Sequence, residues 1–133
     1  MIAKGYIFSR DFMGERVPQS VQNLVLRNYC INNNIEFELS STEYSMENSY
    51  YVLNKLTEEK KYKNIVFYSL FQLPADNEKR LKIIKKLIKK RKKLFFAIED
   101  IKVKKNSDIK KIENIWHIKK ISKKCLSTEE LKI

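Results

Sequence analysis

The stretch that decides the fold is residues 64–70, which read NIVFYSL. Its near-continuous run of β-branched and aromatic side chains predicts a strand that is buried on both faces, as strands of parallel sheets are. Outward from it, shorter apolar runs predict three further strands at residues 2–9, 35–39 and 94–98. The chain therefore contains four predicted strands, and the spaces between them are long enough for helices.

Helical spacing of apolar residues fills each of those spaces. Pro18 suits the first turn of a helix, and Asp76 or Asn77 can cap another. The predicted helices cover residues 18–31, 42–57, 77–91 and 108–120. Strands that alternate with helices in this way imply parallel strands and right-handed crossovers. We therefore expect an α/β fold of three layers, with a mainly parallel four-stranded sheet and helices on both faces.

The 133 residues fit one domain, which we expect over residues 1–121, with residues 122–133 as a tail. The apolar runs are far shorter than the roughly 20 residues that span a bilayer, and the first residues show no signal-peptide pattern. Cys30 and Cys125 show no metal-binding spacing, and nothing requires a disulfide between them, although none is excluded. We expect a cytoplasmic protein that has no metal site and no cofactor.

The net charge of +12 is concentrated in the second part of the chain. Residues 1–78 hold eight Lys/Arg and ten Asp/Glu, whereas residues 79–133 hold twenty and six. Such a basic half attracts nucleic acid, anionic lipid or acidic partners. Lysine-rich solvated helix faces are also common, and lysine is a weaker sign of shaped phosphate recognition than arginine. Nucleic-acid binding through Lys79–Lys93 is therefore kept as an alternative.

Candidate site residues follow from the rule that ligands bind at the carboxyl ends of parallel strands. Polar side chains gather after three predicted strands, and the predicted pocket consists of Ser9, Arg10, Glu15, Arg16, Tyr44, Glu47, Asn48, Ser69 and Gln72. Arginine side chains bind anionic groups, so Arg10 and Arg16 are predicted to hold one. Hydroxyl and amide side chains bind polar ligand groups, which assigns Tyr44, Asn48, Ser69 and Gln72 to ligand binding.

The predicted catalytic residues are Ser9, Glu15 and Glu47, with the glutamates handling protons. Ser9 needs a base to act as a nucleophile, and the one histidine, His117, lies far away in the last predicted helix. Two alternatives stay open: the loop at residues 9–16 is closed by its own ion pairs, and the glutamates are ordinary exposed side chains.

Residues 5–9, 22–24, 66–73 and 94–99 resemble the catalytic domain of small serine recombinases (resolvases and invertases), which implies a resolvase- or flavodoxin-like fold. Ile7 stands where that family has an arginine two residues before its serine. Residues 71–75 replace the family's arginine-bearing pattern after the third strand. The long dimerising helix and the helix-turn-helix tail also have no counterpart. Because those arginines stabilise the scissile phosphate, we expect no strand exchange.

Residues 5–10, 12–19, 41–48, 68–74 and 112–116 resemble the sporadic carbohydrate cluster family of bacterial surface-polysaccharide gene clusters. That resemblance implies a small enzyme or ligand-binding accessory protein in surface-carbohydrate biosynthesis, acting on a sugar or nucleotide-sugar. Two alternatives are a nucleic-acid-binding or regulatory module with an inactive recombinase-like fold, and a non-catalytic partner of a glycan-assembly enzyme. Homo-oligomerisation is compatible with each of them.

Overall fold

The computed structural model describes residues 1–12, 16–46 and 49–131, with side chains described as far as residue 122. The elements follow in the order β1 (Ile2–Phe8), α1 (Gln19–Asn32), β2 (Glu36–Glu43), α2 (Tyr51–Glu58), β3 (Asn64–Phe67), the 3₁₀ turn η1 (Leu70–Gln72), α3 (Asn77–Lys89), β4 (Lys93–Phe96), β5 (Ile101–Val103), the 3₁₀ turn η2 (Asn106–Asp108) and α4 (Ile109–Leu131).

One five-stranded sheet holds the fold together, in the order β2-β1-β3-β4-β5. The first four strands are parallel to their neighbours, and β5 pairs antiparallel with β4 through Phe96↔Ile101 and Leu94↔Val103. The predicted α/β class is confirmed, and the predicted count of four strands becomes five. The strand that the sequence missed is only three residues long and lies at the edge of the sheet.

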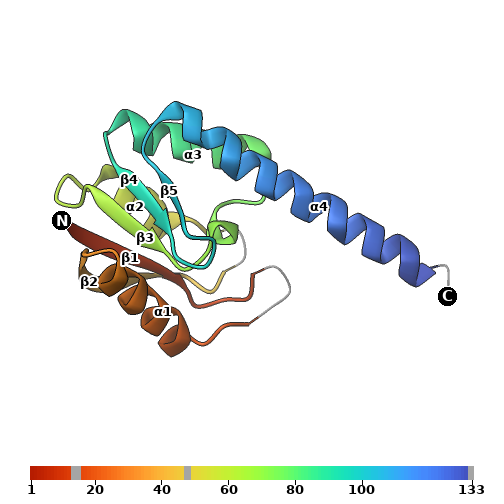
Figure 1. The fold of residues 1–133 in the computed structure, drawn as a ribbon, viewed down its shortest axis with the longest axis horizontal. Helices are drawn as coiled ribbons and strands as arrows, with labels where there is room; N and C mark the ends of the chain where they lie inside the picture. Colours follow the sequence, from red (N-terminus) through yellow and green to blue (C-terminus); the bar gives the residue numbers. More distant parts are fainter. Residues whose placement is uncertain (13–15, 47–48, 132–133) are drawn as a thin grey trace.

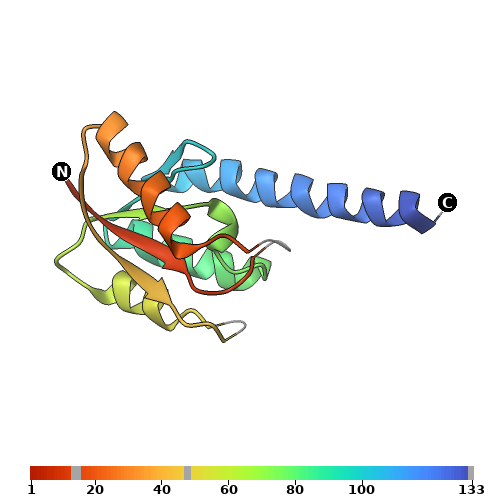
Figure 2. The same ribbon diagram turned by 90° about the horizontal axis from the view of Figure 1, so that it is seen from below.

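Helices cover both faces of the sheet and make three layers, which Figures 1 and 2 show from two sides. On one face α1 buries Leu26 and Cys30 against β1, β3 and β4. On the other face, α2, α3 and the first turns of α4 enclose the larger core. Phe67, at the centre of that core, stacks on Phe96 at 4.9 Å between ring centroids. The sheet therefore buries both faces of its central strands, as the apolar run at β3 predicted.

The boundary between β2 and α2 differs from the prediction. A helix was expected from residue 42, with residues 40–42 as its cap, but these residues and Glu43 extend β2, with Ile7 opposite Thr42 and Phe8 opposite Glu43. The helix begins at Tyr51 instead. Its first backbone N–H groups find an acceptor in the Glu43 carboxylate, which receives hydrogen bonds from Val52 and Leu53 at 3.0 and 3.1 Å. A side chain from the neighbouring strand thus caps this helix, in place of a local Ser or Thr.

The helix α4 continues well beyond the predicted end at residue 120 and reaches Leu131. Its first turns pack on the body, where Ile112 and Trp116 are buried. Beyond them, Figures 1 and 2 show the helix extending away from the rest of the molecule. Ile118 and Ile121 are exposed there. The segment expected to be a tail therefore continues a helix, and a domain limit at residue 121 stays a prediction.

Among the residues that the structure describes, no helix is long and apolar enough to cross a membrane. Cys30 is a free, buried thiol, and burial raises its pKa to about 11. The side chain of Cys125 lies outside the described side chains.

Candidate functional site

Ser9, at the end of β1, is held by the neighbouring strand. Its half-buried hydroxyl donates a 2.6 Å hydrogen bond to the backbone carbonyl of Glu43. A carbonyl is a hydrogen-bond acceptor but not a general base, so this contact does not activate the hydroxyl. His117 is exposed on α4. The catalytic role of Ser9 stays a prediction without a described base to support it.

Arg10 closes the loop that joins β2 to α2. Its Nη1 atom donates to the backbone carbonyls of Tyr44, Met46 and Ser49 at 2.9, 3.0 and 2.8 Å. Its guanidinium lies 4.2 Å from the Phe8 ring centroid and 5.0 Å from that of Tyr50. These contacts connect the end of β1 to the described residues that follow β2 and precede α2. The Nη2 atom is buried and has no hydrogen-bond partner among the described residues.

Ser69 and Gln72 take part in a buried network behind the strand ends. The Ser69 hydroxyl donates to the Glu99 carboxylate at 2.8 Å. The Gln72 amide accepts from the backbone of Tyr68 and donates to Gln22 at 2.9 Å. Gln22 in turn binds both backbone groups of Phe8. These side chains therefore link β1, β3 and the segment after β4, and their predicted ligand contacts stay predictions.

The remaining predicted residues are placed only in part. Glu15, Glu47 and Asn48 lie outside the described residues. Arg16 is exposed, and the Tyr44 ring is half exposed at 5.8 Å from the ring of Tyr51. The structure thus brings Ser9, Arg10 and Tyr44 to one loop cluster and links Ser69 and Gln72 behind it. The roles of all nine residues remain untested.

Sequence reasoning overlooked the role of Glu43 and gave none to Gln22. The Glu43 carboxylate is fully buried and accepts a 2.7 Å hydrogen bond from the Tyr6 hydroxyl. Burial and the neighbouring Glu43 carboxylate both raise the pKa of that Tyr6 hydroxyl, so it remains protonated and donates to Glu43. A charged residue four positions after the predicted strand at 35–39 was the available signal, but its partners lie 37 and 10 residues away in the chain.

The structure divides the basic segment Lys79–Lys93 into two sets. Four of its cations are engaged by the protein itself. Arg80 binds Glu113, Lys92 donates to the carbonyls of Glu59 and Tyr62, and Lys86 and Lys90 both pair with Glu58. The exposed cations that have no carboxylate partner among the described residues are Lys79, Lys82, Lys85, Lys89 and Arg91, and the half-buried Lys93 has no such partner either. The free positive charge is therefore smaller than the sequence count and is confined to certain faces.

Three of the free lysines form a stripe along α3. Lys82, Lys85 and Lys89 are separated by three and four residues, so they lie on one side of the helix. They extend over about 10 Å along the helix axis at 1.5 Å per residue. The paired residues Lys86 and Lys90 occupy the adjacent side, which faces α2. Helical geometry thus separates the solvent-facing charges from those that tie α3 to α2.

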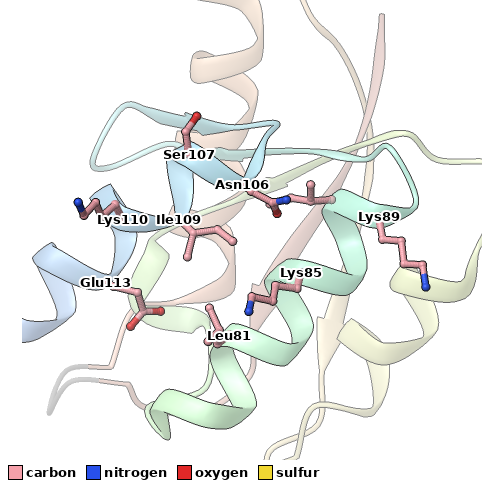
Figure 3. A pocket seen from close by; sticks show the side chains of 9 residues that line it. Leu81, Lys85, Lys89, Asn106, Ser107, Ile109, Lys110 and Glu113 are labelled. Carbon is pink, nitrogen blue, oxygen red and sulfur yellow. The ribbon is translucent and has the colours of Figure 1, made fainter.

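A cleft of about 830 Å³ lies beside this stripe, between α3 and the η2–α4 junction. Figure 3 shows Lys85 and Lys89 on α3 and Lys110 on α4, with Ile109 projecting toward α3 between them. The apolar floor also includes Leu81, and Glu113 is its one acidic lining residue. Because Glu113 is bound to Arg80, the exposed charge around the cleft is positive.

Arg80 fixes the two helices that form the cleft. It is 1% exposed, and its Nε donates to Glu113 on α4 at 3.0 Å. Its Nη1 binds the carbonyls of Pro74 and Ala75, and the guanidinium lies 4.5 Å from the Trp116 ring centroid. Because Arg80 is buried and paired with Glu113, it holds α3 and α4 at a fixed distance from each other.

Comparison with known proteins defines the class of this fold. No family model and no curated protein matches the chain. Among solved structures, it is similar to a resolvase family site-specific recombinase from Streptococcus pneumoniae, with a TM-score of 0.63 and 12% identity over 96% of this chain and 95% of that one. It is also similar to the N-terminal catalytic domain of TP901-1 integrase, with a TM-score of 0.59 and 14% identity over 92% and 98%.

The protein is therefore an α/β protein with a resolvase-like fold, as the resemblance in residues 5–99 implied. The sequence analysis predicted a helix only as far as residue 120 and no counterpart of the recombinases' long helix. The helix α4 has 23 residues, so the expectation that the chain has no long helix is corrected. At 12% and 14% identity the likeness concerns the fold alone.

The predicted role in surface-carbohydrate biosynthesis is wrong in the light of these neighbours, which are site-specific recombinase domains. Nothing in the comparisons supports the carbohydrate cluster family or a sugar ligand. The resemblance to the carbohydrate cluster family was misleading because the matching segments consist largely of strand-end and loop residues, and such residues can serve the fold and not a ligand. In the structure several of these residues, such as Gln72, make contacts that hold the fold.

Proposed function

We propose that this protein is a nucleic-acid-binding module that uses the lysine stripe of α3 and the adjoining cleft, and that it does not exchange strands. The observation that carries the proposal is the set of free cations, Lys82, Lys85, Lys89 and Lys110, on two helices whose separation is fixed by Arg80. The solved structures that share the fold are a site-specific recombinase and the catalytic domain of an integrase, which favours nucleic acid over other anionic partners. The proposal places the protein in the cytoplasm.

The chemistry of the stripe suits a phosphate backbone. Lysine ammonium groups are compact point charges that bind phosphate without strict geometry. Each phosphate they neutralise releases a condensed counterion, so binding weakens as salt rises. Contacts of this kind position a protein on a duplex and carry no sequence information. We therefore infer binding that depends on charge and backbone shape and shows little sequence preference.

We infer that the protein does not exchange strands from the contacts of the residues at the end of β1. Cleaving a phosphodiester needs an activated nucleophile and cations that stabilise the charged transition state. The Ser9 hydroxyl donates to a carbonyl, and Nη1 of Arg10 is occupied by three more carbonyls. Ile7 is buried in the core in the position where the recombinase pattern has an arginine.

The test is fluorescence anisotropy with a labelled DNA duplex of about 20 base pairs, over a series of salt concentrations. A variant with Lys82, Lys85 and Lys89 all changed to Ala is expected to bind at least about tenfold more weakly. Its slope of log affinity against log salt should fall by up to about 2.7, at roughly 0.9 per lost phosphate contact.

The matched control changes Lys55, Lys60 and Lys63 to Ala, which removes the same charge from exposed positions of α2 and of the segment that follows it. This control should retain most of the affinity. An equal loss in both variants would mean that net charge alone drives binding. No binding by the wild type at about 50 mM salt would refute the proposed function, since the electrostatic term is then close to its strongest.

A further inference from the structure

A second cavity, distinct from the lysine cleft, lies where the loop after β1 meets η1 and α4. It has a volume of about 390 Å³, within the range of pockets that hold small molecules. Aromatic rings dominate its wall, and the lining residues used below are Phe8, Arg10, Phe12, Tyr50, Phe71 and Trp116. Phe71 packs edge-on against Trp116, and Phe12 packs edge-on against Phe8, so the wall is a set of fixed ring faces and edges.

Two hydrogen-bond donors of this wall have no acceptor. They are Nη2 of Arg10 and Nε1 of Trp116, which are the two buried side-chain polar atoms without a partner among the described residues. Both belong to residues that line this one cavity. Trp116 is 2% exposed, so its N–H is shielded from bulk water. A buried donor without an acceptor costs about 1–3 kcal/mol, and an acceptor supplied by a ligand would remove that cost.

The cavity also carries the positive charge of Arg10, which no ion pair among the described residues neutralises. Arg10 forms no ion pair with a described carboxylate, because its Nη1 bonds all go to neutral carbonyls. Burial raises the pKa of the neighbouring Tyr50 hydroxyl, the charge of Arg10 and a hydrogen bond with the Arg10 side chain oppose that rise, and the charge of Glu43 adds to it. The phenol is therefore neutral at physiological pH. Asp11, also in the lining, is exposed at the rim.

We propose that this cavity binds a small planar organic acid, an aromatic carboxylate in chemical class. Its carboxylate supplies acceptors for the unpaired donors, its charge is opposite to that of Arg10, and its ring can pack against the aromatic wall. Because both donors are covered by the wall, binding includes a rotation of wall side chains, which occurs on fast timescales. The site uses none of the lysines of the proposed nucleic-acid surface and stands independently of that function.

The chain contains one tryptophan, and this residue lines the cavity, so its fluorescence is a probe of the site. The experiment titrates the full-length protein with benzoate, with benzamide as the neutral planar probe and acetate as the charged non-planar probe. Benzoate is expected to change the Trp116 emission in a saturable way, with half-saturation below about 10 mM. Benzamide and acetate are expected to act at least tenfold more weakly.

Two variants locate the effect. Ala75 lines the mouth of the cavity and is exposed, so Ala75→Phe fills the mouth while its backbone carbonyl keeps its bonds to Arg80 and Lys120. This variant should abolish the benzoate response, whereas Ser20→Phe, at an exposed position of α1, should retain it. Arg10→Lys, with folding checked by circular dichroism, should weaken the response at least tenfold.

Three outcomes would overturn the site. They are no saturable change with benzoate, equal responses to benzoate and benzamide, and an undiminished response in Ala75→Phe. None of these results bears on DNA binding, which is measured with a different probe and different variants.

Discussion

Glu43 illustrates how one side chain can join three parts of a fold. Its carboxylate accepts hydrogen bonds from the Tyr6 hydroxyl and from the backbone N–H groups of Val52 and Leu53. The N-terminus of a helix carries partial positive charge, so a buried carboxylate is stabilised at this position. The charge of Glu43 thus substitutes for a local cap and sets where α2 begins.

Changing Glu43 to Gln should destabilise the protein by about 1–3 kcal/mol, because the amide removes the charge and turns one acceptor into a donor that faces other donors. Urea denaturation followed by circular dichroism measures the effect. Glu36→Gln, at an exposed position of β2, is the control and should change stability by less than about 0.5 kcal/mol. Equal losses in the two variants would contradict the capping role.

Between elements, Glu58 joins α2 to α3 by pairing with Lys86 and Lys90. These lysines lower the pKa of Glu58 from its ordinary value of 4.5 to about 2. The carboxylate therefore stays ionised in the folded state at pH values where it would be protonated in the unfolded chain. Its contribution to stability is present above pH 4.5 and is lost as the pH falls toward 2. Salt weakens it, since the pair is exposed.

Carboxyl NMR titration of Glu58 tests this link. Changing both Lys86 and Lys90 to Met should return the pKa of Glu58 close to 4.5, since these two cations cause its depression. Changing Lys85 and Lys89 to Met removes the same charge from the same helix and should leave the pKa low. If both variants raised the pKa equally, the general field of α3 would be responsible.

The elements show which features the sequence could reveal. The strands β3 and β4 were predicted because their apolar runs depend only on burial between two layers of helices. Their ends were placed too late, since β3 ends at Phe67, where 70 was expected, and β4 ends at Phe96, where 98 was expected. The start of α2 was not predicted correctly, because Tyr6 and Glu43 become neighbours of that helix only after the sheet forms. The strand β5 has three residues, which is too short for an alternating pattern to stand out.

The candidate site was predictable to a similar degree. The strand-end rule brought attention to Ser9, Arg10 and Ser69, which do lie at the ends of β1 and β3. Their contacts with backbone carbonyls and with Glu99 depend on distant segments and leave no pattern in the sequence. The basic segment was visible as a run without acidic residues. Which lysines are free could be learned only from the position of Glu58.

At the scale of the whole molecule, the described core ends on α4 at Trp116. A chain that stops after residue 121 keeps every residue of both core clusters. We therefore expect it to fold, with a free energy of unfolding within about 0.5 kcal/mol of that of the full chain.

A chain that stops after residue 115 serves as the contrast. It loses Trp116, which packs against Phe71 and the Arg80 guanidinium, and should be at least about 3 kcal/mol less stable. Thermal and urea unfolding of the three proteins decide the matter. A large loss on removing residues 122–133 alone would show that the domain extends to the end of the chain.

The position of β1 at the inside of the sheet has a consequence for the time course of synthesis. This strand is made first, yet one of its two neighbours, β3, begins at Asn64. At about 5–20 residues per second, the ribosome needs roughly 3–12 s to add the intervening segment. During that interval Tyr6, Ile7 and Phe8 lack the partner that later covers them. Nascent chains stalled before β3 should therefore recruit chaperones, and chains stalled after β4 should release them.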